Sequence, residues 1–490
     1  MTLPRFPLLA KALALGAVTL SLILALDRID QLVDEREGRL REAQASVAES
    51  FASAQVLLGP SLQRRCTERW EVETVSGSSR ASKVEQREHL LQALPATLAI
   101  DGTVAVEERR RGLFRVNVYT LQATVDASWA ALDALKPRAT QPNSTLSCQD
   151  PVLWVAVKDT RGIGRAEVVI DGAAQSVRPG SPAREAAAGF QVPLPAARIE
   201  AGKPLSARVA LTLAGTEALS FVPLAGDTQV TLRADWPHPS FNGRFLPVKR
   251  EIDARGFSAQ WQVSALATQA PQQLRAGTGL CAVGGEAAPG SAHVPGWQAI
   301  APEGLPARGA TAECIERFGV ALIDPVSPYT LADRATKYGL LFIMLTFVAV
   351  ALVEVMRRLR VHPIQYLLVG SALALFFLLL VSLGEHLPFA PAYAIAAGAC
   401  TLLLTYYAVH VLKGWGAGLL FGSGIALLYG VLYVLLQLEQ TALVMGALLL
   451  FAVLAAVMVA TRRIDWYALL AQWRGGSATE PRADTRSEPQ

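Results

Sequence analysis

The fold class is decided by residues 364–383, IQYLLVGSALALFFLLLVSL, a run without a charged side chain. About 20 apolar residues in a helix can cross the hydrocarbon core of a bilayer. Four further apolar runs of similar length surround it, at 338–356, 389–411, 416–437 and 441–460. Only a few residues separate consecutive runs. The C-terminal part of the chain therefore predicts a bundle of five transmembrane helices.

A sixth apolar run lies near the N-terminus, at 8–26, and is interrupted only by Lys11. A secretory signal peptide has the same kind of charged flank and apolar core. No small-x-small cleavage pattern follows the run, because the chain continues directly into Leu26-Asp27-Arg28. We interpret the run as an uncleaved signal-anchor helix, with a cleaved signal peptide as the alternative.

The composition supports a membrane protein. Of the 490 residues, 52% are hydrophobic and 18% are charged, and the mean hydropathy is +0.32. Soluble globular domains have about 25% charged residues, so a simple cytosolic protein is excluded, and the apolar content excludes a disordered one. The net charge of +4 is small for this length and gives no reason to expect a nucleic-acid partner.

The charges of the short loops predict the orientation. With the N-terminus in the cytoplasm, 1–7, 357–363, 412–415 and 461–490 are cytoplasmic, and the loops at 384–388 and 438–440 lie outside. Among these short segments, Lys and Arg occur only in the cytoplasmic set, which includes Arg5, Arg357, Arg358, Arg360, Lys413, Arg462, Arg463 and Arg474. This bias follows the positive-inside rule. We therefore expect six spans, two cytoplasmic termini and an external region at 27–337.

The external region predicts a stalk followed by a large β domain. Apolar residues between 29 and 51 recur at helical spacing, which extends the anchor (1–28) into a stalk helix at 29–57. Beyond it, apolar and polar residues alternate in short runs bounded by Gly and Pro, which is typical of a β sandwich. We place this mainly β, sandwich-like domain at 58–330, with a Gly/Pro-rich insertion at 271–317. The five-span bundle follows at 331–467, and a disordered cytoplasmic tail at 468–490.

The cysteines favour an oxidising compartment for this region. Cys66, Cys148, Cys281 and Cys314 are external, whereas Cys400 lies inside a span. Four cysteines allow three pairings. We expect Cys66–Cys148, joining two strands, and Cys281–Cys314, closing the insertion, with free buried thiols as the alternative.

The sequence contains no recognisable catalytic motif, metal cluster or cofactor loop, so no catalytic residue, metal or cofactor is expected. The candidate functional cluster consists of ionisable residues at the external ends of the spans: Asp333, Arg334, Lys337, Glu385, His386 and Glu439. Charges at that depth are costly unless paired or hydrated, so they can mark a site. The alternative is that they are ordinary interface charges that close helix ends.

Two further features have structural explanations. Gly414, Gly418 and Gly422 form overlapping G-x-x-x-G steps, which allow close packing of helices, within the bundle or between two copies. Glu354 is the one acid inside a C-terminal span, and a salt bridge to Arg358 at i, i+4 would account for it.

Several longer motifs stand out along the chain. Those of the C-terminal part are Tyr329–Ile343, Arg360–Gly370, Ser382–His386, Leu428–Gly430 with Tyr433 and Gln437–Glu439, and Thr461–Tyr467. Those of the external region are Leu58-Gly59-Pro60, Arg111-Gly112 with Val118-Tyr119, and Trp236–Phe241 through Leu246-Pro247. Together these motifs resemble the CreD family of bacterial inner-membrane proteins. The four external cysteines and the 271–317 insertion differ from the usual pattern of the family.

The resemblance implies an anchor, a large periplasmic domain and a C-terminal bundle in the inner membrane of a Gram-negative bacterium. It also implies a role in cell-envelope integrity and the envelope stress response, and it supplies no catalytic residues. We expect a protein, more readily non-enzymatic than enzymatic, whose periplasmic domain binds an envelope component or a protein partner. The alternatives are a membrane enzyme or transporter for a lipid-linked substrate, and a sensor. The lipid bilayer is the one partner that the composition requires, and the sequence leaves the oligomeric state open.

Overall fold

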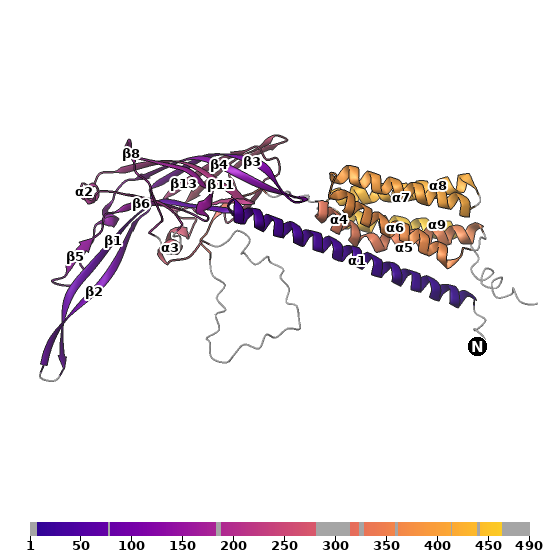
Figure 1. Cartoon of the computed structure of the whole chain (residues 1–490), viewed down its shortest axis with the longest axis horizontal. Coiled ribbons are helices and arrows are strands. Elements are labelled where there is room, and N and C mark those ends of the chain that lie inside the picture. The colour runs from indigo at the N-terminus through magenta and orange to yellow at the C-terminus, as the bar shows by residue number, and fades with distance from the viewer. Residues whose placement is uncertain are drawn as a thin grey trace, which may run out of the picture. The chain divides into compact units, whose positions relative to one another are not determined.

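Figure 1 shows the computed structural model of the chain. The structure describes residues 7–76, 79–182, 188–280, 314–322, 328–357, 361–412, 414–438 and 442–462. The chain divides into two compact units, residues 40–325 and residues 1–39 together with 326–490. The first unit is mainly β and the second is helical, and helix α1, Pro7–Ser50, contributes to both.

Two β-sheets form the β unit. The first has the strand order β14-β17-β12-β1-β6-β10-β9, with β2 and β5 also paired to β1, and the second has the order β15-β16-β13-β3-β4-β11-β7-β8. In chain order the strands are β1 Gln55–Ser76, β2 Ser79–Ala93, β3 Thr97–Arg111, β4 Phe114–Trp129, β5 Thr145–Cys148, β6 Val152–Val157, β7 Ile163–Ile170, β8 Ala173–Gln175, β9 Arg178–Pro179, β10 Gly189–Pro193, β11 Leu205–Thr216, β12 Ala218–Phe221, β13 Asp227–Ala234, β14 Ser240–Gly243, β15 Lys249–Asp253, β16 Gly256–Ser264 and β17 Phe318–Ala321. Short helices η1 (Asp133–Leu135), α2 (Ala196–Glu200) and α3 (Ala270–Arg275) connect them.

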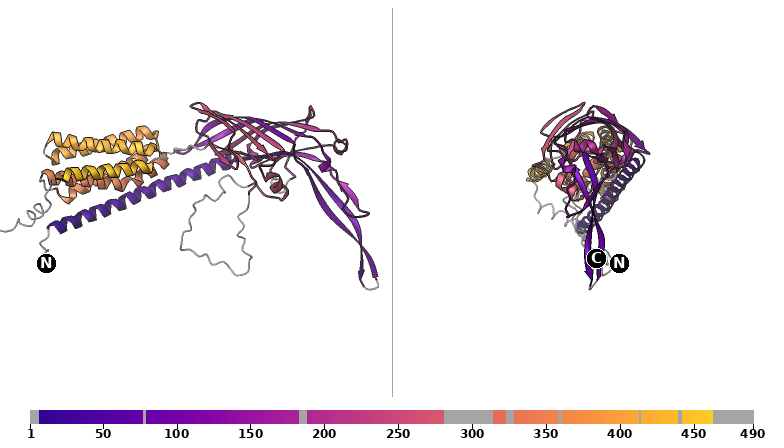
Figure 2. Two further views of the ribbon diagram at one scale, coloured as in Figure 1. Left: turned by 180° about the vertical axis from the view of Figure 1, so that it is seen from behind. Right: turned by 90° about the vertical axis from the view of Figure 1, so that its left-hand side faces the viewer.

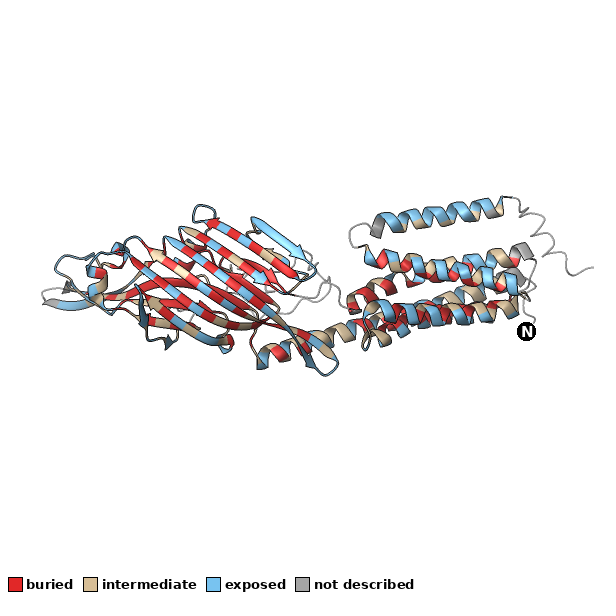
Figure 3. Cartoon of the chain, turned by 90° about the horizontal axis from the view of Figure 1, so that it is seen from above, coloured by how far each residue is buried: buried red, intermediate tan, exposed pale blue. Residues whose placement is uncertain are grey.

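The period-two pattern of the sequence produces this core. Along β11, buried residues such as Val209 and Leu211 alternate with more exposed ones. Figure 3 shows the same alternation of buried and exposed residues along strands of the β unit. One hydrophobic cluster combines buried residues of the first sheet, such as Phe318, with residues of the second, such as Trp129 and Trp261. The prediction of a large, mainly β domain is therefore confirmed.

A long antiparallel hairpin of β1 and β2 extends beyond the sheets (Figure 2). Strand β5 pairs with β1 at the base of this extension, and Cys66 faces Cys148 in the register. These two cysteines form a disulfide, as the sequence analysis expects. The other expected pair, Cys281–Cys314, lies outside the described residues because Cys281 is not among them.

In the part of the chain that the structure describes, the helical unit contains the first part of α1 and six further helices. These are α4 Pro328–Lys337, α5 Gly339–Arg357, α6 Pro363–Gly384, α7 Phe389–Val411, α8 Trp415–Gln437 and α9 Ala442–Thr461. The start of α6 is encoded locally: His362 Nδ1 accepts from the Ile364 amide, the Gln365 side chain accepts from the His362 amide, and Pro363 occupies the first turn. This arrangement is a capping box with a proline where no amide donor is needed.

The described helices give fewer candidate spans than the six predicted. Among these residues, α1, α6, α7 and α8 are long and apolar enough to cross a membrane. Helices α4 and α5 are long and apolar enough only as a pair, and they count as a fifth span if the pair, which is bent by 43° at Tyr338, is one broken span. The apolar part of α9 described here, Val444–Val459, is shorter. The described chain thus contains four or five candidate spans.

The segment boundaries also differ in detail from those expected. Helix α1 ends at Ser50 and β1 begins at Gln55, so the β structure starts before position 58. Most of the expected insertion at 271–317 and the tail at 468–490 lie outside the described residues. The helix at 270–275 occupies the near end of that insertion.

The three candidate packing glycines differ in their surroundings. A Cβ atom at Gly418 would overlap Val409 of α7, and one at Gly422 would overlap Thr405 of the same helix. These two positions therefore bring α7 and α8 into close contact. Gly414 precedes α8 as its N-cap, and a Cβ there would meet nothing closer than 3.9 Å among the described residues, so its role in helix packing stays a prediction.

Candidate functional site

The predicted cluster lies where α1, α4 and α6 meet. Val33, Ala332 and Val381, one from each helix, form a small buried hydrophobic group. Because Asp333 and Lys337 follow Ala332 on α4, and Glu385 directly follows α6, this contact brings charged residues of three helices to one end of the unit.

The charges at this junction are engaged in ion pairs. Lys337 Nζ lies 2.7 Å from Asp333 Oδ2, one turn earlier on α4. Glu385 Oε1 lies 3.3 Å from Arg36 Nε of α1. The Asp333 and Glu385 side chains are 23% and 13% exposed, so both acids are partly withdrawn from solvent. The two pairs neutralise four charges within the unit.

The remaining predicted members do not complete one shared site. His386 is exposed, and its Nδ1 lies 3.5 Å from the Ser382 carbonyl oxygen. Glu439 lies outside the described residues. Within the described chain, no hydrogen bond or ion pair joins Asp333 or Lys337 to Glu385 or His386. Arg334, also on α4, adds a further positive charge.

Sequence reasoning missed the contribution of α1. Asp30 lies close enough to Asp333 and Lys337 to interact with them electrostatically. Its Oδ1 atom is buried without a hydrogen-bond partner among the described residues. The helical periodicity of 29–51 was the one sequence signal for this contact, because an apolar face on α1 must pack against other residues.

A second charged site, also missed, lies deeper in the helical unit. Glu354 of α5 is only 5% exposed and forms an ion pair with Lys11 of α1. It also accepts hydrogen bonds from the Tyr366 hydroxyl at 2.9 Å and from the Val361 amide at 3.2 Å. The expected partner, Arg358, lies outside the described residues. Lys11 is the only charge in its apolar run, which was the one sequence signal for this pairing.

The β unit contains a polar site around Glu68 of β1, whose side chain is fully buried. Its carboxylate accepts from the Thr140 amide and hydroxyl at 2.7 and 2.6 Å, from the Gln141 amide at 2.9 Å and from the Ser144 hydroxyl at 2.6 Å. His89 Nε2 of β2 lies 2.9 Å away. The hydrogen bonds from Ser144 and Thr140 hold the pKa of Glu68 far below its usual value of 4.5, although burial opposes this.

We expect the Glu68→Gln variant to lose part of the acid sensitivity of the protein. A carboxyl whose pKa is lower in the folded state stabilises that state above its unfolded pKa. Its contribution is therefore complete above about pH 4.5 and is lost as the pH falls toward the folded value. Thermal unfolding of the full chain, followed by tryptophan fluorescence between about pH 7 and pH 3, measures this. The exposed Glu88→Gln variant is the control, and parallel curves for wild type and Glu68→Gln would contradict the assignment.

Comparison with known proteins identifies the family. A family model described as "Inner membrane protein CreD" matches residues 7–467. The chain belongs to the CreD family. The Escherichia coli (strain K12) protein "Inner membrane protein CreD" is 34% identical over 466 residues, which cover 95% of each chain. The resemblance noted in the motifs is thereby confirmed, and with it a place among inner-membrane proteins.

Solved structures add nothing to the CreD assignment. Two crystal structures of an M1 zinc metallopeptidase from Deinococcus radiodurans, one of them a mutant bound to a Tyr-Ser-Ala substrate, align with 34% of this chain and 38% of theirs. The identities are 11% and 12%, and the TM-scores are 0.18 and 0.17. Scores this low carry no argument about fold or function.

Proposed function

We propose that this CreD-family protein maintains the integrity of the cell envelope and takes part in the envelope stress response without being an enzyme. In this proposal the β unit lies in the periplasm and binds an envelope component or a protein partner, and the helical unit anchors it in the inner membrane. Membership of the CreD family supports a location in the inner membrane. The long segment between the first and second apolar runs, residues 27–337, would be the binding module.

The proposed orientation has six spans, both termini in the cytoplasm and residues 27–337 in the periplasm. The absence of Lys and Arg from the loops at 384–388 and 438–440 supports this orientation. The Cys66–Cys148 disulfide supports it independently, because disulfides persist in oxidising compartments such as the periplasm.

We prefer a non-enzymatic role because the charged residues where α1, α4 and α6 meet are paired with one another. A catalytic or transport site presents charge to its ligand, whereas Asp333 is paired with Lys337 and Glu385 with Arg36. Such pairs orient helices and close their ends. The alternative is a membrane enzyme or transporter for a lipid-linked substrate, with the candidate cluster as its site. The buried Oδ1 atom of Asp30 beside this cluster, which has no hydrogen-bond partner among the described residues, is the observation that favours it.

Complementation of a deletion strain tests the two candidates. We expect wild type, Lys337→Ala and the double variant Glu385→Ala with His386→Ala to restore dye exclusion and detergent resistance equally, because ion pairs at a surface contribute about 0–1 kcal/mol. The membrane level of each variant is matched by immunoblotting. Loss of complementation by a variant that still inserts would establish the cluster as a working site. If wild type itself has no effect on permeability, the envelope role is wrong.

A further inference from the structure

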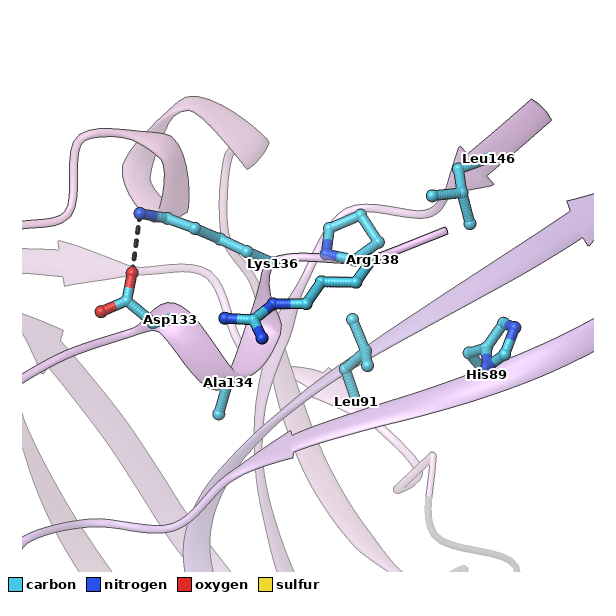
Figure 4. A pocket seen from close by; sticks show the side chains of 8 residues that line it. His89, Leu91, Asp133, Ala134, Lys136, Arg138 and Leu146 are labelled. Carbon is cyan, nitrogen blue, oxygen red and sulfur yellow. Dashed lines mark ion pairs between the residues drawn. The ribbon is translucent and has the colours of Figure 1, made fainter. Parts of the chain in front are cut away.

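A pocket of about 400 Å³ opens in the β unit beside the buried Glu68 (Figure 4). His89 and Leu91 of β2 and Leu146 of β5 lie on one side, and Lys136, Pro137 and Arg138 follow η1 on the other. The volume is within the range of small-molecule sites. The pocket thus combines basic side chains with short apolar surfaces.

The pocket wall formed by Lys136, Pro137 and Arg138 is held in place by hydrogen bonds to a buried carboxylate and by a nearby disulfide. The segment after Arg138 is anchored by three hydrogen bonds from Thr140 and Gln141 to the Glu68 carboxylate. The Cys66–Cys148 disulfide fixes β5, and with it Leu146, to β1. A buried carboxylate and a disulfide therefore converge on one loop. Such support preorganises a binding site, because little conformational freedom is lost when a ligand enters.

Lys136, which lines the pocket, and Arg64, which contacts the Leu135 carbonyl oxygen of η1, are both engaged within the protein. Lys136 Nζ lies 2.8 Å from Asp133 Oδ1, so these two charges compensate each other. Arg64 is 8% exposed, and among the described residues it donates to the carbonyl oxygens of Gln149 and Leu135.

Arg138 is exposed and has no hydrogen bond or ion pair among the described residues. The pKa of Asp133 is lowered chiefly by its hydrogen bond with Lys136, and the charge of Arg138 adds only a small contribution. Figure 4 shows its guanidinium group on the side of the pocket opposite His89. A guanidinium fork binds carboxylate or phosphate oxygens in two parallel hydrogen bonds.

We infer that this pocket binds an oxyanion attached to a short apolar group, with Arg138 as the anion-binding residue and Leu91, Pro137 and Leu146 against the apolar part. The inference rests on the proposed function in that it names the class of envelope component the β unit takes. A phosphate ester and a carboxylate share the required chemistry, and the experiment separates them.

The test uses the full chain in nanodiscs with butyl phosphate, butyrate and butanol as probes. Titration calorimetry gives dissociation constants, and hydrogen–deuterium exchange shows whether peptides covering 133–148 become protected. We expect butyl phosphate or butyrate to bind and butanol not to. We expect Arg138→Gln to weaken binding at least about tenfold, since it removes a charge-assisted contact, and Arg138→Lys to weaken it less, because it keeps the charge but not the fork. Arg250→Gln, an exposed change on β15 in the other sheet, is the matched control and leaves binding unchanged.

Each outcome decides the inference. Preference for butyl phosphate identifies a phosphate ester, and preference for butyrate identifies a carboxylate. Equal binding of butanol, retention of affinity by Arg138→Gln, or protection found only outside β2 and residues 133–148 overturns the inference. If the wild-type chain binds neither anion but complements the deletion strain, the pocket assignment fails while the envelope role stands. If the wild-type chain binds an anion but does not complement the deletion strain, the pocket assignment stands while the envelope role fails.

Discussion

Replacing Cys66 and Cys148 together with alanine is expected to lower the free energy of unfolding of the β unit by about 4 kcal/mol. The two cysteines are 82 residues apart, so the disulfide removes much of the freedom of the unfolded chain. Replacing both avoids leaving a free thiol in the core. Denaturant unfolding of the full chain, followed by tryptophan fluorescence, measures the loss. Because β1 and β5 also pair through backbone hydrogen bonds, we expect the variant to remain folded.

The control for this prediction lies in the same chain. Cys400→Ala removes a buried cysteine from α7 that forms no disulfide, and it should leave the β-unit transition in place. A loss below about 1 kcal/mol in the double variant would show that the disulfide contributes little beyond the strand pairing. Faster hydrogen exchange at 145–148 in the double variant would show directly that β5 depends on the disulfide.

The second large effect is expected at Glu354. Its replacement by leucine removes the carboxylate that pairs with Lys11 and deprives the Tyr366 hydroxyl and the Val361 amide of their acceptor. Breaking a buried pair by removing one member costs about 3 kcal/mol or more. We therefore expect a marked loss of stability, measurable by steric trapping in bicelles, and a lower level of the protein in membranes.

A double-mutant cycle distinguishes the pair from ordinary packing. In Lys11→Met with Glu354→Leu, both charges are gone and the apolar replacements can pack, so the combined cost should be well below the sum of the single costs. The more exposed Asp333–Lys337 pair is the matched comparison, and Lys337→Met should cost less than about 0.5 kcal/mol. Additive costs for Lys11 and Glu354 would show that the ion pair is energetically unimportant.

Short-range patterns made much of the fold predictable. A helix that crosses a bilayer must be apolar over its whole length, so runs such as 364–383 are visible in the sequence alone. Strands with one buried face alternate, which made a mainly β region recognisable from stretches such as Phe114–Tyr119. The bend between α4 and α5 was not predicted. Gly339 follows Tyr338 and weakens a helix there, but a single glycine in an apolar helical run does not by itself specify a bend.

The candidate sites were less predictable, because they depend on distant pairings. From sequence, Glu354 had a neighbour of opposite charge at i, i+4, whereas the partner seen in the structure is Lys11, 343 positions away. Arg36 and Glu385 likewise belong to helices far apart in the chain. Glu68 carried no signal at all, since a glutamate in an alternating strand is usually exposed.

The sequence by itself determined that this is a membrane protein, where its apolar helices and mainly β domain lie, and which family it belongs to. Each of these depends on local composition, on the spacing of apolar residues or on short motifs. Only the tertiary structure decided which charges are paired and where a binding pocket opens. Ion pairs and pockets depend on which elements become neighbours. That choice is made by packing across the whole chain, which brings Glu68 to the 140–144 segment and Lys11 to Glu354.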